Sequence, residues 1–253
     1  MSDQLKATRE GFGDEIVELG KANKNICVVD IDIGKSCKTQ AFRKALPEQY
    51  YNVGIAEQNG ASHQCVEDLG VLRTIPNMTV IMPADYYSAR KLVAAAAAYD
   101  GPVYLRFTRD AIPVIYDDST PFEIGKAHMI RDGKDVAIIA NGDTVRLAIT
   151  AAEELAKKGI DARVVDMHTV KPLDVDCVKD CIDKIGKIIT VEDHNILNGL
   201  GSAVCEVVAE AGKGIVKRIG VQDQFGQSAP YERLLAMNGI TVENIVATAE
   251  ALQ

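Results

Sequence analysis

The chain has no tryptophan, no Cys-x-x-Cys pair and no apolar run as long as the ~18 residues that cross a membrane. Its first residues lack the apolar core of a secretion signal. The net charge is −8 and the lysines and arginines are dispersed, so no basic stripe is present to neutralise nucleic acid or an anionic membrane surface. We therefore expect a cytoplasmic protein that binds neither nucleic acid nor membranes.

Cysteine is scarce and irregularly spaced. Several of the six cysteines fall inside apolar runs, which predicts reduced core residues. Cys177 and Cys181 are four residues apart on a predicted helix, but no nearby histidine or second pair completes a tetrahedral set of ligands. We predict no metal site in this chain.

The composition is that of an ordinary α/β protein. Of 253 residues, 47% are hydrophobic and 25% charged, which is enough to bury a core in each of two domains. In the first half, the periodicity predicts alternating helices and strands. The predicted elements are helix 8–22, strand 26–31, helix 39–46, strand 51–55, strand 79–83, helix 86–98 with Asp85 as N-cap, and strand 103–107.

An irregular segment, 110–123, contains Pro113, Pro121 and a polar run, as inter-domain linkers do. After it the alternation restarts, which favours a parallel sheet with helices on both faces. The fold class predicted is α/β with two domains, 1–122 and 123–253, each with a parallel-type sheet flanked by helices. The second-half elements are strand 136–140, helix 144–158, strand 162–166, helix 175–185, strand 187–191, helix 200–211 and strand 216–219.

One acid follows a short, Gly-containing apolar run that is typical of a buried strand. The run Val53-Gly54-Ile55-Ala56 leads directly into Glu57. Ligands of open α/β sheets bind beyond the carboxyl ends of the strands, so this carboxylate would project into the crevice. Glu57 is our first catalytic candidate. The alternative is an acid in the first turn of a helix, where the helix dipole favours it.

The histidines differ in their surroundings. His63 lies in a loop of small polar residues, where an imidazole is able to transfer protons or bind a hydroxyl group; a solvated loop residue is the alternative. For His194, beyond a predicted strand end and polar on both sides, we favour the solvated interpretation. His128 and His168 are predicted to be structural.

Arg106 and Arg109 follow a predicted strand together with Thr108. A guanidinium at a strand end is suited to hold a phosphate or carboxylate by paired hydrogen bonds. The alternative is an ion pair with an acid such as Asp110 or one in the linker.

Two turns contain glycine near a predicted helix start. Asn198-Gly199-Leu200-Gly201 superficially resembles a dinucleotide fingerprint, but the third glycine is missing, which favours a tight turn and helix packing. Gly142-Asp143-Thr144 is interpreted as a helix-start turn only.

Over its whole length the chain resembles the carboxyl-terminal half of transketolase, as found in organisms that encode the enzyme as two subunits. The form Ile55-Ala56-Glu57-Gln58-Asn59 favours transketolase over deoxyxylulose-phosphate synthase or the β subunit of 2-oxo acid dehydrogenases, which share the architecture. The resemblance implies a pyrimidine-binding domain followed by the family's carboxyl-terminal domain. Other matching segments are 7–9, 60–64, 72–76, 83–85, 105–110, 191–194 and 199–201.

The resemblance also implies roles for individual residues. Glu57 would hydrogen-bond the aminopyrimidine of thiamine diphosphate and favour the tautomer that removes the thiazolium C2 proton. Asp32 would lie near the cofactor at the subunit interface. His63 would line the substrate channel. The residues implied in binding the sugar phosphate are Arg9, Ser36, His63 and Arg109.

The implied activity is the transfer of two-carbon ketol units between sugar phosphates, as in the pentose phosphate pathway. An amino-terminal partner subunit would hold the diphosphate and its Mg²⁺, because no Gly-Asp-Gly with a downstream Asn occurs in this sequence. Copies of this chain would contact each other within a heterotetramer.

The sequence departs from the family pattern directly after Asn59. In the family a helix, a strand, an aromatic-rich helix and another strand separate the Glu-Gln-Asn triplet from the Gly-x-x-His-Gln loop, but here Gly60 follows Asn59 at once. On the order of fifty residues are missing, a large part of a domain of ~100–150 residues. Two explanations are open, a deletion or a segment left out of the sequence as written. A catalytically silent subunit with an assembly or binding role is the alternative function.

Overall fold

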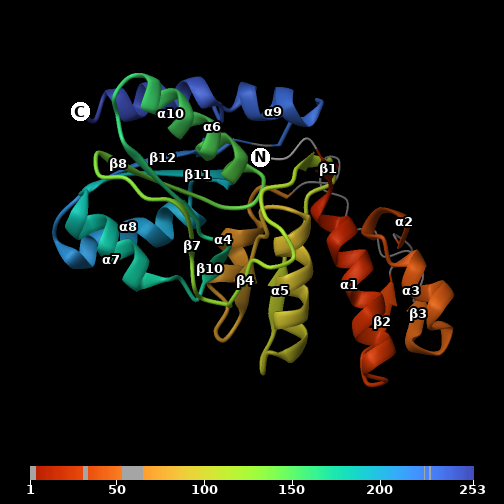
Figure 1. Ribbon diagram of the computed structural model, residues 1–253. Coiled ribbons are helices and arrows are strands. Elements are labelled where there is room, and N and C mark those ends of the chain that lie inside the picture. Colours follow the sequence, from red (N-terminus) through yellow and green to blue (C-terminus); the bar gives the residue numbers. More distant parts are fainter. Residues whose placement is uncertain (1–3, 31–33, 53–64, 225, 228) are drawn as a thin grey trace.

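The computed structural model describes residues 4–30, 34–52, 65–224, 226–227 and 229–253 (Figure 1). Within these ranges no helix combines the length and apolar character that crossing a membrane requires.

The largest sheet in the described part of the chain has five strands in the order β12-β11-β8-β9-β7. Every residue of β8 (Val136–Ala140) and β9 (Ala162–Asp166) is buried, as expected of central parallel strands rich in valine and isoleucine. The edge strand β7 (His128–Arg131) is antiparallel, whereas β11 (Lys187–Asn195) and β12 (Ile215–Val221) continue the parallel order.

Helices cover both faces of this sheet (Figure 1). On one face α6 (Thr144–Lys157), α9 (Tyr231–Met237) and α10 (Val242–Glu250) bury residues such as Leu155 against Ile138. On the other face α7 (Val175–Lys184) and α8 (Leu200–Ala211) pack Ile182 and Leu200 against Ile139. The prediction of helices on both faces is confirmed here.

A second sheet has the order β10-β4-β5 and combines strands that are distant in sequence. β4 (Thr79–Ile81) and β5 (Val103–Leu105) are parallel, and β10 (Thr169–Lys171) pairs antiparallel with β4. Beside them α4 (Asp68–Arg73) buries Leu69, and α5 (Tyr86–Ala98) begins as predicted, because Asp85 accepts a hydrogen bond of 2.8 Å from the Ser88 amide. The boundary near residue 122 stays a prediction, since this sheet contains strands from both sides of it.

The first elements of the chain form a separate group, drawn in red and orange in Figure 1. β2 (Val28–Asp30) and β3 (Tyr50–Asn52) make a two-stranded parallel sheet, next to α1 (Thr8–Ala22), α2 (Gly34–Cys37), α3 (Gln40–Ala45) and a 3₁₀ turn (Pro47–Gln49). The short strands β1 (Leu5–Lys6) and β6 (Ile112–Pro113) pair antiparallel. Val29 and Tyr51 are register partners and are 61% and 55% exposed, so one face of β2–β3 is open in the described chain.

The predicted environment of the cysteines is wrong for most of them. All six are free thiols, but Cys181 alone is buried, while Cys27 and Cys65 are exposed. Apolar neighbours in sequence do not ensure burial at the end of a helix or strand.

Candidate active site

The first turn of α1 and the segment after β5 meet through two threonine side chains. The Thr8 and Thr108 hydroxyls are 3.1 Å apart, and the Thr108 amide donates to Thr8 Oγ1 at 2.8 Å. Both residues are buried. This contact lies at the carboxyl end of β5, where open α/β sheets bind ligands.

Two predicted phosphate ligands, Arg9 and Arg109, each come directly after one of these threonines. The Arg9 guanidinium donates through Nη1 to the Ser36 backbone oxygen at 3.1 Å, and its Nε is buried and has no hydrogen-bond partner. Arg109 is exposed. The fold therefore brings Arg9 into contact with Ser36 and places Arg109 beside the same threonine pair.

The other predicted site residues, Asp32, Glu57 and His63, lie outside the described residues, and their roles stay predictions. Asp30, two residues before Asp32, is buried at the end of β2. Its carboxylate accepts hydrogen bonds from Thr39 Oγ1 at 2.8 Å and from the Tyr50 hydroxyl. These bonds tie the ends of β2 and β3 together at the same kind of strand edge.

For Arg106 the ion-pair alternative is confirmed, with partners that differ from those expected. Its Nη1 donates to Asp193 Oδ1 at 2.6 Å, and its Nε lies 3.2 Å from Asp68 Oδ2. Arg106 is only 7% exposed. Burial alone would lower the pKa of the guanidinium, but Asp193 and Asp68 raise it, so the group stays charged. Arg106 joins β5, α4 and β11 and is not available as a ligand.

The solvated interpretation of His194 is wrong. His194 is fully buried within β11, where its Nδ1 lies 2.7 Å from the Asn195 oxygen and its Nε2 accepts a hydrogen bond of 3.1 Å from the Gly70 amide of α4. Burial, and next Arg106, lowers its pKa, which favours the neutral form that such an acceptor requires. His128 and His168 pack around Phe122, as structural histidines do.

The glycines near α8 serve helix packing, as predicted. The buried Glu192 carboxylate accepts from the Leu200 and Gly201 amides at 2.7 and 2.8 Å, and a Cβ on Gly199 would lie 2.1 Å from Glu192 Oε2. A carboxylate thus occupies the end of the helix where a nucleotide phosphate would have to bind. Burial raises the pKa of Glu192 to about 7.

Asp143 was missed by the interpretation of its segment as a turn only. Its Oδ1 accepts a hydrogen bond of 2.7 Å from the Thr108 hydroxyl, so the carboxyl-terminal region contacts the threonine pair directly. Asp143 is fully buried; burial, and next the nearby Asp193, raises its pKa to about 7. A signal was available in the sequence, since Gly142 allows the positive φ of 54° and the close approach to Met82 that this turn requires.

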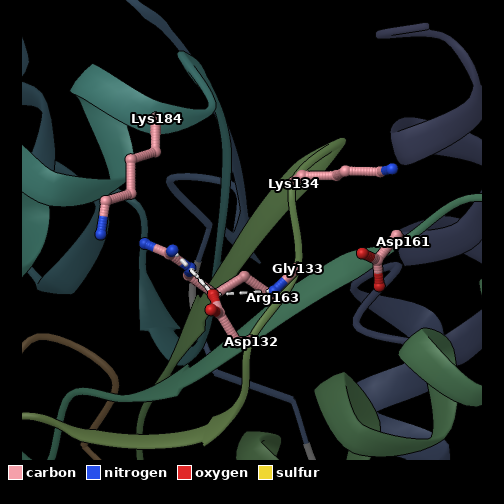
Figure 2. Close-up of a pocket in the computed structure, with 6 residues that line it drawn as sticks. All are labelled: Asp132, Gly133, Lys134, Asp161, Arg163 and Lys184. Carbon is pink, nitrogen blue, oxygen red and sulfur yellow. Dashed lines mark hydrogen bonds and ion pairs between the residues drawn. The ribbon is translucent and has the colours of Figure 1, made fainter.

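A charged hollow lies elsewhere, at the amino ends of β8 and β9 (Figure 2). Its lining includes Gly133, Lys134 and Lys184, and the Arg163 side chain is directed at Asp132, with a shortest separation of 2.7 Å. Arg163 also pairs with Asp180 at 2.7 Å. Because its guanidinium is already held by two acids and the hollow is at the strand edge opposite to the usual ligand edge, we do not assign a site here.

Across the described ranges, no group of three or more His, Cys, Asp or Glu side chains is arranged to hold a metal ion. Cys177 and Cys181 are part of the packing of α7, where Cys181 also contacts Arg163.

Models of two transketolase domains match the chain, the pyrimidine-binding domain over residues 58–114 and the C-terminal domain over residues 125–245. One of the two subunits of an apulose-4-phosphate transketolase from Phocaeicola vulgatus is 32% identical, and the alignment covers 98% of each chain. The chain belongs to the transketolase family. It corresponds to the second, carboxyl-terminal subunit of a split transketolase, and the resemblance stated from its motifs is confirmed.

Two further comparisons agree with this assignment. The 6-deoxy-6-sulfo-D-fructose transketolase subunit SqwH of Clostridium sp. is 40% identical over 77% of this chain and 60% of its own length. A solved structure described as "Split gene transketolase, inactive beta4 tetramer" is 37% identical, with a TM-score of 0.91 over 97% of this chain and 98% of that one. The transketolase-type α/β fold is therefore confirmed.

The alignment with the Phocaeicola vulgatus protein also bears on the missing segment. It extends over 307 positions, whereas this chain has 253 residues, so the relative has residues at 54 or more positions where this chain has none. This difference agrees in size with the segment expected to be missing after Asn59.

Proposed function

We propose that this subunit, with an amino-terminal partner subunit, transfers two-carbon ketol units between sugar phosphates, and that Arg9, Ser36 and Arg109 bind the phosphate group. The observation that carries the proposal is the arrangement around Thr8 and Thr108. It places two arginines at one strand edge and leaves Arg9 Nε buried without a partner. A guanidinium N–H in that state is suited to a phosphate oxygen.

The described residues fit the sugar phosphate better than they fit thiamine diphosphate. The acid near the cofactor position that the structure describes, Asp30, already accepts bonds from Thr39 and Tyr50. The ring would instead be held by Glu57 and Asp32, and the diphosphate with Mg²⁺ by the partner subunit. Thiamine diphosphate, when bound, supplies the nucleophilic carbon that accepts the ketol unit.

Within this proposal, each residue of the chain has a limited task. Glu57 would share a proton with the aminopyrimidine, and His63 would move protons at the substrate hydroxyl groups. Arg9 and Arg109 would orient the substrate through its phosphate. Contact between copies of this chain, a cytoplasmic location and a place in the pentose phosphate pathway belong to the same proposal.

The test combines the full chain with the amino-terminal subunit of a split transketolase, thiamine diphosphate and Mg²⁺. Ketol transfer is measured with a phosphorylated ketose and with its unphosphorylated counterpart. We expect Glu57→Ala to abolish transfer from both. Arg109→Ala should raise KM for the phosphorylated donor about tenfold or more and leave the unphosphorylated donor nearly unchanged, because only the former loses a charge-assisted hydrogen bond.

The alternative, a silent subunit with an assembly or binding role, is supported by the 54 positions that this chain lacks relative to the Phocaeicola vulgatus protein. It predicts a stable complex with the partner, measured by sedimentation, and no transfer at saturating cofactor. Turnover that disappears in Glu57→Ala excludes this alternative.

A further inference from the structure

Asp143 occupies the N-cap position of α6 but does not cap that helix. Its backbone is helical, with φ −61° and ψ −20°, and its side chain accepts no bond from the α6 amides. An aspartate at this position normally accepts from an amide of the first turn. Here the side chain extends instead to Thr108, 35 residues earlier in the chain.

The hydrogen bonds around Thr108 have one consistent direction. Thr108 Oγ1 donates to Asp143 Oδ1 at 2.7 Å, so the hydroxyl contact of 3.1 Å between the two threonines is donated by Thr8. The Thr108 amide donates back to Thr8 Oγ1 at 2.8 Å. Each hydroxyl therefore donates once and accepts once, and the direction is set by the acceptor at Asp143.

The contact is enclosed on the side of the carboxyl-terminal region. A Cβ on Gly142 would lie 2.3 Å from Met82 Cε, so the turn before α6 is packed tightly on the end of β4. Asp143 Oδ2 is buried without a hydrogen-bond partner and provides no second anchor for Thr108. The position of Asp143 is thus determined by the turn, and Thr108 follows it.

We propose that Asp143 is a positioning residue for the phosphate site. Through Thr108 and Thr8 it holds the backbone from which Arg109 and Arg9 extend, which gives the carboxyl-terminal region a direct part in substrate binding. This inference rests on the proposed phosphate role of the two arginines. It requires an acceptor at Oδ1 but no negative charge, since a neutral side-chain oxygen also accepts from a hydroxyl.

The experiment measures binding of inorganic phosphate to the full chain by calorimetry, for two pairs of variants. Asp143→Ala and Thr108→Val each remove one partner of the bond, and we expect each to weaken phosphate binding about tenfold. Asp143→Asn and Thr108→Ser keep the acceptor and the hydroxyl, and we expect each to bind within about twofold of the parent. Thermal unfolding of all four variants identifies any that fail to fold.

The outcomes separate this inference from the function on which it rests. If Arg9→Ala and Arg109→Ala weaken phosphate binding but folded Asp143→Ala and Thr108→Val bind like the parent, the positioning role is wrong and the phosphate site stands. If the arginine variants have no effect, or the parent binds no phosphate, both proposals fail. Equal weakening in Asp143→Ala and Asp143→Asn would also overturn the positioning role, because it would indicate a need for charge.

Discussion

The five-stranded sheet of the carboxyl-terminal region and the β2–β3 sheet near the amino terminus both pair strands in parallel, but their surroundings differ. In the first, all residues of β8 and β9 are buried between helices (Figure 1). In the second, Val29 and Tyr51 face outward. Parallel sheets are normally covered on both faces. The comparison shows that one region is complete in itself, whereas the other depends on contacts beyond its own strands.

Arg106 provides such a contact, and Arg106→Ala has the largest expected effect. The substitution leaves Asp68 and Asp193 buried without their counter-charge, which costs about 3–5 kcal/mol of unfolding free energy. Denaturant unfolding monitored by circular dichroism measures the loss. The matched control is Arg90→Ala, which removes a more exposed pair with Glu15 and should cost no more than about 1 kcal/mol. Equal losses would mean that the two regions are not coupled through Arg106.

Two valines test the comparison between the sheets directly. Val164 in β9 is fully buried, so Val164→Ala should cost about 2 kcal/mol of unfolding free energy from lost transfer and cavity formation. Val29→Ala in β2 removes a side chain that is 61% exposed and should stay within about 0.5 kcal/mol. The same denaturant experiment compares them. A large loss from Val29→Ala would show that the open face is covered in solution.

The pH dependence of stability should come mainly from the carboxyl-terminal region. Burial raises the pKa of Asp166 to about 8, and it raises the pKa of Asp143 and of Glu192 to about 7. A raised acid stays protonated in the folded chain after the unfolded chain has lost its proton. Its stabilisation is therefore complete below about pH 4 and is lost as pH rises through 7 to 8, by at most about 1.4 kcal/mol per pH unit for each group.

Asp166→Asn tests this dependence, because an amide oxygen is able to accept from Tyr116 without titrating. Thermal unfolding between pH 5 and 8.5 should show a smaller decline than in the parent. Asp100→Asn, at an exposed loop position, is the control and should reproduce the parent profile. A variant at position 166 with the parent's slope would contradict the assignment of the decline to Asp166.

Helix caps should give the smallest effects and again differ between regions. Thr241 caps α10 through one bond of 3.2 Å from the Asn244 amide, so Thr241→Ala should cost about 1 kcal/mol. Asp85 caps α5 and also accepts from the Ile115 and Tyr116 amides at 2.9 and 2.8 Å. Asp85→Ala should therefore cost more than Thr241→Ala in thermal unfolding, and the reverse order would show that those two loop bonds contribute little.

Elements with regular periodicity and clear ends were predicted to the residue. The helices Thr8–Ala22 and Leu200–Ala211 and the strands Val136–Ala140 and Ala162–Asp166 are examples. In contrast, β10 and α4 were missed, because β10 forms by pairing with a distant strand and α4 has only six residues. Their formation depends on long-range contacts that local patterns do not contain.

The end of β11 illustrates the same limit at the level of the site. The strand was expected to stop near Val191, since polar residues follow, but it continues to Asn195. Each added polar side chain has a partner elsewhere: Glu192 on α8, Asp193 on Arg106 and His194 on Gly70. Conversely, Arg9 and Ser36 were associated with one site by motif resemblance, and the fold brings them into contact.

The pairing of β10 with β4 has a consequence for synthesis of the chain on the ribosome. Thr169 is the register partner of Ile81, so the strand that completes the β4–β5 sheet is made long after the strands that it joins. Domains generally fold as units while the chain is being made, amino-terminal parts first. The amino-terminal region of this subunit has to wait with an unpaired β4 edge until Lys171 leaves the exit tunnel, and translation stopped before that point would yield a nascent fragment open to aggregation.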